Sequence, residues 1–482
     1  MVEYGDDIFI GRREELQELD ALLNKKTASL VVVKGRRRVG KTRLLQEFVK
    51  KKKSIVLRGL APQEGTTEQD ERDEFARQLS TATGLPEVKV DDWTKLFILA
   101  AREVKSGRVI LILDEISWMG SKDSKFVSKL KDAWDEYFKK NPKLILILCG
   151  SISTWIDENI VNNTGFYGRI SWTLSLEQLP LPDANALLEA HGFKGSAYEK
   201  FKILSVTGGV PWYLEQMQGN YSADENIKRQ CFTKGGVLVE EYDRIFKELF
   251  GKRDVLYKTI IKTLANSSLE YNEIAKNAEY KSSGRLSQYL EDLEKAGFVA
   301  RDYSWSLKGG KQLAISQFRL SDNYLRFYLK TIASKRALIE KGRFKFVALS
   351  SFPGWESIMG LQFENLVVNN REILLNKLNI RGEDILYDNP FLQRKTALTK
   401  GCQIDYMIQT KYKNLYACEV KFSRNPVNTN VIEDMREKIN RLALPRGLAV
   451  LPILIHVNGV AESVTAKDYF YSVIDFGDLL KH

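Results

Sequence analysis

The chain has 482 residues, too many for one hydrophobic core, and this length predicts about three domains. Hydrophobic residues make up 44% of it and charged residues 28%, which is the composition of a soluble globular protein. Lysine and arginine outnumber aspartate and glutamate by 73 to 62, so the formal net charge is +11. This excess favours anionic partners such as nucleic acids, although solvated surface lysine would account for it as well.

Two functional classes are disfavoured by the same survey. The chain has only three histidines, and its four cysteines show no metal-knuckle spacing, which argues against histidine chemistry and zinc sites. The longest apolar stretch, Leu448 to Val457, contains Pro452 and is too short to span a bilayer. The N-terminal segment lacks the basic and apolar regions of a secretory signal. We therefore expect a cytoplasmic protein that does not contact membranes.

The segment from Ser29 to Phe48 is the most informative part of the sequence. An apolar run, Leu30 to Val33, predicts a buried strand, and apolar spacing after Thr42 predicts a helix. The loop between them matches G-x-x-x-x-G-K-[ST], the phosphate-binding loop, in which backbone N–H groups surround phosphate oxygens. We expect ATP to contact Gly35, Arg36, Arg37, Arg38, Val39, Gly40, Lys41, Thr42 and Arg43. Lys41 would reach the terminal phosphates, and Thr42 would bind Mg²⁺.

Further apolar strands follow, in alternation with helices, and predict a parallel sheet that is buried on both faces. The run Val109 to Leu113 ends in Asp114 and Glu115, and Leu144 to Leu148 leads to Ser151. Strand ends of such a sheet lie beside the phosphate loop. Asp114 is expected to act on Mg²⁺, Glu115 to polarise the attacking water, and Ser151 to sense the γ-phosphate. A solvated pair of acids and a simple strand-ending turn are the alternatives.

Two further motifs carry a resemblance to known families. The segment Phe9 to Leu16, with Gly11 and Arg12, resembles the motif that lines the adenine pocket of AAA+ ATPases. The segment Thr207 to Leu214 resembles the G-G-x-P element of STAND ATPases, which implies that Pro211 approaches the base. From about residue 7 to residue 480 the chain is similar to the archaeal-type ATPase family, which is related to the origin-recognition ATPases.

The same resemblance bears on four arginines. Arg169 matches a Gly-Arg pair of the family, which implies an arginine finger or sensor; a structural ion pair is the equal alternative. The run Arg36 to Arg38 departs from the family's loop. These three arginines would contact nucleic acid or another domain, or lie on a solvated surface.

Residues beyond the expected ATPase core are predicted to form a helical lid and then a winged helix. Three helices, Val255–Leu264, Asn272–Asn277 and Ser283–Ala296, precede a hairpin that begins at Phe298 and turns near Gly309-Gly310. The start of the third helix offers donors for DNA: Lys281, Ser282, Ser283, Arg285, Ser287 and Gln288. Acidic residues follow in the same helix, so DNA contact and a packing role both remain open.

The C-terminal part resembles the PD-(D/E)xK restriction-endonuclease-like fold. A helix predicted over Ile358 to Leu375 contains Glu364, and two predicted strands carry Asp405 and then Glu419 and Lys421. The resemblance implies that Asp405 and Glu419 hold Mg²⁺, that Lys421 activates water, and that Glu364 is the helical acid of the fold. Ile404 stands where the motif has proline. A domain that keeps this fold without activity is the alternative.

The predicted fold class is α/β, with a P-loop parallel-sheet ATPase core, a helical lid, a winged-helix domain and a C-terminal α/β nuclease-like domain. The expected domain boundaries are 1–176, 177–250, 251–330, a linker at 331–354, and 355–482. The expected function is an ATP-hydrolysing switch that controls a metal-dependent DNA nuclease. The alternative is a non-enzymatic C-terminal domain in a STAND-type switch that binds DNA or a protein partner. A homo-oligomer is also open.

Overall fold

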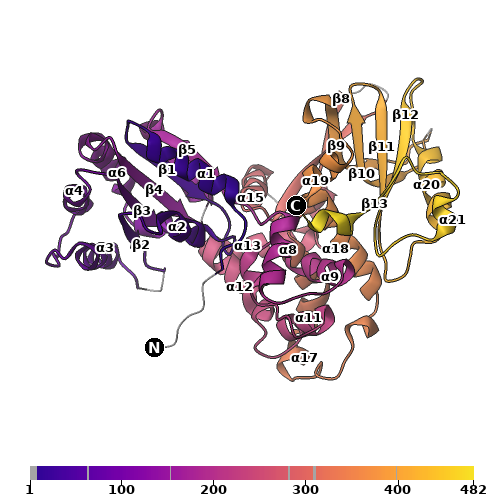
Figure 1. Cartoon of the computed structure of the whole chain (residues 1–482), viewed down its shortest axis with the longest axis horizontal. Helices are drawn as coiled ribbons and strands as arrows, with labels where there is room; N and C mark the ends of the chain where they lie inside the picture. The colour runs from indigo at the N-terminus through magenta and orange to yellow at the C-terminus, as the bar shows by residue number, and fades with distance from the viewer. Residues whose placement is uncertain are drawn as a thin grey trace. The chain divides into compact units, whose positions relative to one another are not determined.

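The computed structural model describes residues 8–61, 65–151, 153–280, 283–307, 311–397 and 399–481. The chain divides into two compact units, Met1–Leu179 and Pro180–His482, shown in Figure 1. The expected hairpin turn at Gly309-Gly310 and the helix start at Lys281 and Ser282 lie outside the described residues. In the described part of the chain, no helix is long and apolar enough to cross a membrane.

The first unit is built on a five-stranded sheet in the order β2-β3-β4-β1-β5, and every pairing in it is parallel. The strands are β1 (Ser29–Lys34), β2 (Ser54–Arg58), β3 (Val109–Asp114), β4 (Leu144–Gly150) and β5 (Ile170–Ser175). Every residue of β3 and β4 is buried. The prediction of a parallel sheet covered on both faces is therefore confirmed, and the carboxyl ends of these strands meet at one edge.

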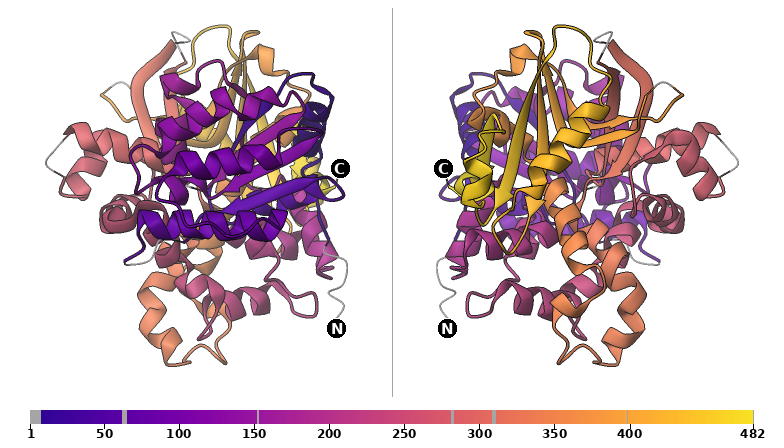
Figure 2. Two further views of the ribbon diagram at one scale, coloured as in Figure 1. Left: turned by 90° about the vertical axis from the view of Figure 1, so that its left-hand side faces the viewer. Right: turned by 90° about the vertical axis from the view of Figure 1, so that its right-hand side faces the viewer.

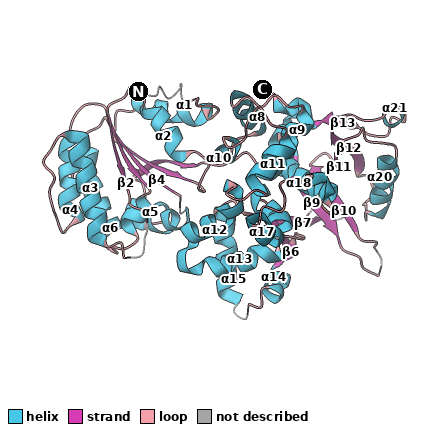
Figure 3. Ribbon diagram, turned by 90° about the horizontal axis from the view of Figure 1, so that it is seen from below, coloured by secondary structure: helices cyan, strands magenta, loops and turns pink. Residues whose placement is uncertain are grey.

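Helices cover both faces of this sheet (Figure 3). One face packs α1 (Arg13–Ala21) and α2 (Lys41–Val49) against alternate residues of β1 such as Val31 and Val33. The other face carries α3 (Glu68–Thr83), α4 (Trp93–Glu103), α5 (Ile116–Gly120) and α6 (Phe126–Glu136). Four aromatic rings hold this second layer together, namely Phe75, Trp93, Phe97 and Phe126. Alternate side chains of β1 thus point to opposite faces of the sheet and belong to two separate apolar cores.

The second unit begins with helices and continues into a small antiparallel sheet. The helices are α8 (Leu181–Ala190), α9 (Ala197–Thr207), α10 (Pro211–Leu214), α11 (Ala223–Cys231), α12 (Val237–Phe250), α13 (Asp254–Thr263), α14 (Tyr271–Asn277) and α15 (Ser283–Lys295). The strands β6 (Leu269–Glu270), β7 (Val299–Ser306) and β8 (Lys311–Leu320) pair in the order β6-β8-β7. Three helices followed by this hairpin give the element order of a winged helix.

One hydrophobic core runs through these helices and the segment that follows them. It extends from Val206 in α9 to Met359, and it includes α16 (Asn323–Phe327) and α17 (Arg336–Glu340). Stacked rings such as Tyr242 on Tyr328 join α12 to the chain after the hairpin. The segments expected as lid, winged helix and linker therefore share one core within the second unit.

A second five-stranded sheet ends the chain, in the order β13-β12-β11-β10-β9 (Figure 2, right). The strands are β9 (Ile385–Gln393), β10 (Cys402–Thr410), β11 (Asn414–Phe422), β12 (Ala449–Val457) and β13 (Ser472–Asp475). Pairing is antiparallel among β9, β10 and β11, and parallel among β11, β12 and β13. Helix α20 (Asn430–Arg441) packs on one face through Val431, Ile432 and Met435.

Helix α18 (Trp355–Asn369) covers the other face, where Phe363 packs on Phe422 of β11. The prediction of one helix from Ile358 to Leu375 was wrong, because α18 is followed by a separate helix, α19 (Arg371–Lys377). Asn370 lies between them with φ −115° and donates its side-chain amide to the Leu366 carbonyl at 2.8 Å. An asparagine that bonds its own helix end in this way competes with helix continuation.

A buried ion pair within the small sheet is linked to α18 by a hydrogen bond. Arg319 of β8 donates from Nε to Asp302 of β7 at 2.8 Å, and from Nη1 to the Asn365 side chain of α18. The side chains of Arg319 and Asp302 are only 8% and 9% exposed. A buried pair of this kind is costly to break, because the remaining charge loses its partner.

We expect Asp302→Ala to reduce the unfolding free energy of this unit by about 3–5 kcal/mol, because it leaves the Arg319 charge buried without its carboxylate. The double variant Asp302→Ala/Arg319→Met should recover part of this loss, because it removes the buried charge but leaves the Asn365 side-chain oxygen without its donor. The control is Glu240→Ala, which breaks an exposed pair with Arg244 and should cost less than about 1 kcal/mol. Equal shifts of the urea midpoint in the Asp302 and Glu240 variants would contradict the prediction.

Candidate functional site

The loop between β1 and α2 has a backbone that only particular residues can adopt. Gly35 and Gly40 have φ of 151° and 92°, and Arg38 is also in the left-handed region with φ 73°. A Cβ at Gly35 would lie 2.3 Å from the carbonyl oxygen of Leu176. The loop thus needs glycine at its first position for steric reasons and at Gly40 for its φ, as expected for a loop whose N–H groups turn inward.

Lys41 points back into this loop. Its side chain is 6% exposed, and Nζ donates to the carbonyls of Gly35 at 2.8 Å and Arg36 at 2.9 Å. Burial lowers the pKa of Lys41, while nearby groups including Glu115 and Asp114 oppose that shift. An ammonium group held within the loop by neutral carbonyls can exchange them for phosphate oxygens, so the residue fits the predicted phosphate contact.

Asp114 lies at the end of β3 beside the first turn of α2. It is 2% exposed, and its Oδ2 accepts from Thr42 Oγ1 at 3.1 Å and from Arg58 Nε at 3.1 Å. A hydroxyl and a carboxylate side by side next to a phosphate loop are suited to Mg²⁺ bound with ATP. The sequence analysis did not predict the role of Arg58, although this residue ends β2 directly opposite Asp114 in the parallel register.

Glu115 and Ser151 are brought together from two neighbouring strand ends. Glu115 has φ 52°, and its Oε2 accepts from the Ser151 backbone N–H at 3.1 Å and from Ser151 Oγ at 2.8 Å. A non-glycine residue with positive φ costs energy, and it is held here by two bonds to the next strand. The structure thus joins the expected water-polarising acid to the expected sensor, and both roles remain predictions.

Arg12 contacts the loop from the N-terminal motif. It is 7% exposed, and its Nη2 donates to the Val39 carbonyl at 3.1 Å and to the Glu177 carbonyl. Gly11 precedes it with φ 75°. These contacts fix the phosphate loop against the chain that leaves β5. The adenine contacts of Gly11 and Arg12 remain predictions, as does the base contact of Pro211, the first residue of α10 in the second unit.

Arg169 forms an ion pair in the first unit. Its Nε and Nη2 donate to the carboxylate of Asp135 on α6 at 3.0 and 2.8 Å. This bidentate contact, with help from Lys139 and Lys131, holds the pKa of Asp135 well below its usual range. Of the two roles left open by the sequence, the structural ion pair is the one formed here, and a finger or sensor role remains a prediction.

The C-terminal sheet gathers a second group of charged residues. Tyr406 of β10 pairs with Cys418 of β11, and this register sets Asp405 beside the start of the Glu419–Lys421 segment. Asp405 Oδ2 accepts from the Val420 N–H at 2.9 Å, and Lys421 Nζ lies 2.8 Å from Glu419 Oε1. Glu419 is 2% exposed. The antiparallel pairing expected from the sequence is confirmed, and three of the expected residues lie together.

Lys438 on α20 is a member of this group that the sequence reading missed. Its Nζ donates to Glu419 Oε2 and lies 3.5 Å from Asp405 Oδ1. The two carboxylates raise the pKa of Lys438 overall, against the effect of burial. A signal was present, because Lys438 follows the buried Val431 and Met435 at helical spacings of seven and three.

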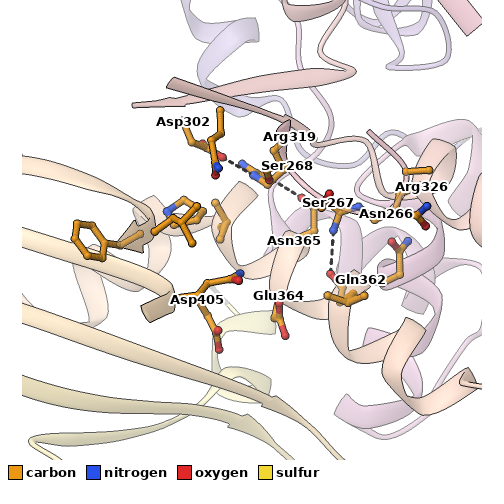
Figure 4. A pocket seen from close by; sticks show the side chains of 18 of the residues that line it. Asn266, Ser267, Ser268, Asp302, Arg319, Arg326, Gln362, Glu364, Asn365 and Asp405 are labelled. Atoms are coloured by element: carbon orange, nitrogen blue, oxygen red, sulfur yellow. Dashed lines mark hydrogen bonds and ion pairs between the residues drawn. The ribbon is translucent and has the colours of Figure 1, made fainter. Parts of the chain in front are cut away.

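Glu364 of α18 completes the set expected from the sequence. Burial, and then the charge of Asp405, raise its pKa to about 7. Glu364 and Asp405 line one cavity of about 370 Å³, and Figure 4 shows both carboxylates at the same end of it. Among the described residues, no three His, Cys, Asp or Glu side chains lie close enough together to hold a metal ion. The carboxylates of Asp405 and Glu419, with water as a further ligand, could hold Mg²⁺ if the ammonium group of Lys438 moved away from them.

We expect Lys41→Ala to weaken ATP binding, because it removes the buried ammonium from the phosphate loop. The loss should exceed about tenfold in Kd, as for a charge-assisted hydrogen bond to phosphate. Binding of a fluorescent ATP analogue measures it. The control is Lys50→Ala, which removes a largely exposed lysine just beyond the same helix. If Lys41→Ala bound and hydrolysed ATP like the control, the nucleotide site would be misassigned.

The raised pKa of Glu364 predicts how the stability of the protein depends on pH. Its pKa is raised from 4.5 to about 7, so the folded state binds this proton more tightly than the unfolded state does. Stability from this group is complete below pH 4.5 and is lost as the pH rises through about 7. Thermal unfolding with EDTA should show this loss in the native chain and not in Glu364→Gln. Parallel pH profiles for the two proteins would contradict it.

Comparisons with known proteins agree with this geometry. Residues 9–217 match the model of an ATPase domain family described as predominantly from Archaea. An uncharacterized protein, MJECL04, of Methanocaldococcus jannaschii is 26% identical over 376 residues, covering 77% of this chain and 79% of that protein. An uncharacterized ATP-binding protein, MJ0423, of the same organism is 46% identical over 50 residues, covering 10% of this chain and 85% of its own length.

The solved structure of the Walker-type ATPase PABY2304 of Pyrococcus abyssi superposes with a TM-score of 0.51 at 17% identity. The alignment covers 67% of this chain and 96% of that one, so the two share the fold. The family match includes the phosphate loop, the acidic end of β3 and the segment around Pro211. Residues 9–217 are therefore similar to an ATPase domain family described as predominantly from Archaea, and the chain has a P-loop ATPase fold.

Proposed function

We propose that the chain is an ATP-hydrolysing switch whose nucleotide state controls a metal-dependent DNA nuclease formed by the C-terminal sheet. The observation that carries the nuclease half is the convergence of Asp405, Glu419 and Lys421 on adjacent strands, with Glu364 facing the same cavity as Asp405. In this proposal Asp405 and Glu419 hold Mg²⁺, which would supply a Lewis acid and a bound water. Lys421 orients that water, and Glu364 serves as a further acid of the site.

The ATPase half is supported by the phosphate loop and the strand ends around it. Lys41 binds the terminal phosphates, and Thr42 and Asp114 hold Mg²⁺. Glu115 polarises water, once it exchanges its bonds to Ser151 for a bond to that water. The archaeal-type ATPase match covers all of these residues.

Control of the C-terminal site is supported by contacts within the second unit. Helix α9 runs directly into the Gly208-Gly209-Val210-Pro211 element. The carbonyl of Ser205, in the last turn of α9, accepts from Gln362 Nε2 and from Asn323 Nδ2, both at 2.8 Å. Gln362 lies on α18, two residues before Glu364. A displacement of the end of α9 would therefore also displace α18, the helix that carries Glu364.

The second candidate is a switch with a C-terminal domain that only binds DNA or a protein partner. It is favoured by the lysines, because the ammonium groups of Lys421 and Lys438 both pair with Glu419. Buried carboxylates neutralised by lysine are also what a purely structural ion-pair network would contain. Strand scission, rather than binding, separates the two functions.

The test is cleavage of plasmid and linear DNA with Mg²⁺ or Mn²⁺, with and without ATP. We expect metal-dependent scission that falls about 100-fold or more in Glu419→Gln, since even outer partners of metal ligands are worth about 10–100-fold. The control is Glu433→Gln, an exposed glutamate on α20, which should cleave like the native chain. ATP should alter the native rate and leave the Lys41→Ala rate unchanged.

Absence of scission in the native chain, with DNA binding retained, would favour the second candidate. Scission that survives Glu419→Gln would place the chemistry elsewhere. Scission that responds to ATP equally in the native chain and in Lys41→Ala would separate cleavage from the phosphate loop.

A further inference from the structure

The cavity that contains Glu364 and Asp405 also has a cationic side. It is lined by the loop before β6, by β7 and β8, by the chain after β8, by α18 and by β9–β10, so its walls come from both sheets of the second unit. Arg326, at the end of α16, and Lys330, in the π-helical turn Tyr328–Ile332, supply this side. In the view of Figure 4, Glu364 lies between Arg326 and Asp405.

Arg326 is a half-buried cation on which the charges of Glu364 and Asp302 act, although neither carboxylate forms an ion pair with it in the described residues. No ion pair of Arg326 occurs within the described ranges; its Nε is buried without a hydrogen-bond partner there, and its Nη1 only reaches the Leu361 carbonyl at 3.4 Å. Arg319 also lines the cavity, but its donors are already bonded to Asp302 and to the Asn365 side chain. A buried guanidinium donor that lacks an acceptor is costly. An anion entering the cavity would remove that cost.

Lys330 adds a second unneutralised charge. Its Nζ donates to the neutral oxygen of the Asn266 side chain at 2.7 Å, and the described part of the chain offers it no carboxylate within ion-pair distance. Burial lowers the pKa of Arg326 to about 10, and burial and then the Arg326 charge lower the pKa of Lys330. Asn266, Ser267 and Ser268 place further donors on the same side.

These donors suit a phosphate group. A guanidinium binds phosphate through a planar fork, and a lysine beside it adds a point charge. The volume of about 370 Å³ lies near the lower end of the range of ligand pockets, roughly 300–1,000 Å³. One nucleotide can enter such a space. A B-form duplex cannot, since its major groove alone is about 12 Å wide.

We propose that this cavity is a phosphate-binding subsite for one nucleotide of a single nucleic-acid strand, with Arg326 and Lys330 as its anion-binding residues. The inference deepens the proposed nuclease function and rests on it for the meaning of the acidic end. A strand bound here sets one phosphate on the cations and leads the adjoining phosphodiester toward Glu364 and Asp405. The substrate is then a single-stranded end or a displaced strand, and not an intact duplex.

The experiment measures the affinity of a labelled single-stranded oligonucleotide by fluorescence anisotropy in EDTA, so that no cleavage occurs. We expect Arg326→Gln to weaken binding about tenfold or more, and Lys330→Gln to weaken it less, because a charged hydrogen bond to phosphate is lost. The slope of log K against log salt should fall by about 0.7 for each lost contact. The control is Lys341→Gln, which removes an exposed charge outside the cavity.

Two further ligands identify the source of the phosphate. A blunt duplex without free strands should bind equally well to the native chain and to Arg326→Gln, and a deoxynucleoside monophosphate should compete only weakly. If the monophosphate alone showed the Arg326 dependence, a strand subsite would be excluded. Arg326→Lys keeps the charge and loses the fork, and it should fall between the native chain and Arg326→Gln, which separates binding from a folding defect.

The outcomes distinguish this inference from the nuclease proposal. A native chain that cuts no DNA, but whose single-strand affinity drops in Arg326→Gln and Lys330→Gln, keeps the subsite and loses the nuclease. A chain that cuts DNA with the same single-strand Kd in Arg326→Gln, Lys330→Gln and Lys341→Gln loses the subsite and keeps the nuclease.

Discussion

Helix α18 carries buried polar side chains that need hydrogen-bond partners inside the second unit. The elements packed around the helix supply these partners. Four consecutive residues of this helix contact different parts of the unit. Gln362 donates to α9 and α16, Phe363 packs on β11, Glu364 faces the cavity, and Asn365 accepts from Arg319 of β8. Since buried amides are costly when unpaired, none of these contacts can be given up separately. The helix therefore connects α9 and α16, the hairpin and the C-terminal sheet to one another within this unit.

Charge compensation differs between the two ends of the cavity beside α18. The acidic end holds Glu364 and Asp405, and Lys438 approaches Asp405. Lys438 and Lys421 also pair with Glu419, which does not line the cavity. At the cationic end, Arg326 forms no ion pair in the part of the chain described here and its Nε has no acceptor, although the charges of Glu364 and Asp302 act on it. A buried guanidinium Nε without an acceptor is not explained by stability, because an unsatisfied buried donor costs free energy. Such an arrangement is typical of a site that acquires its counterion from a ligand.

Local patterns in the sequence predicted the sheet and the strand-end residues of the first unit, but not the contact of Arg58 with Asp114. The apolar runs before Gly35 and Asp114 predicted parallel strands, and strand order then placed Thr42, Asp114, Glu115 and Ser151 at one edge. The same reasoning predicted the β10–β11 hairpin and its carboxylates. It failed where a single side chain competed with the backbone, as Asn370 does at the break between α18 and α19. It also failed for Lys438 and Arg326, whose partners lie on other elements and become neighbours only after folding.

The link between α9 and α18 sets a limit on how nucleotide could act on the C-terminal sheet. A ligand shifts an equilibrium only by its differential affinity for the two states, so ATP must favour one position of the Gly208–Pro211 element over another. Moving the end of α9 would separate the Ser205 carbonyl from two amide donors at once, each worth about 1 kcal/mol net and more if left unsatisfied. Gln362 and Asn323 also bond each other through backbone carbonyls. The lower-cost motion is therefore one in which α9, α16 and α18 move together. Any change in the position of Glu364 relative to Asp405 would then also have to shift the contact of Phe363 with Phe422 on β11.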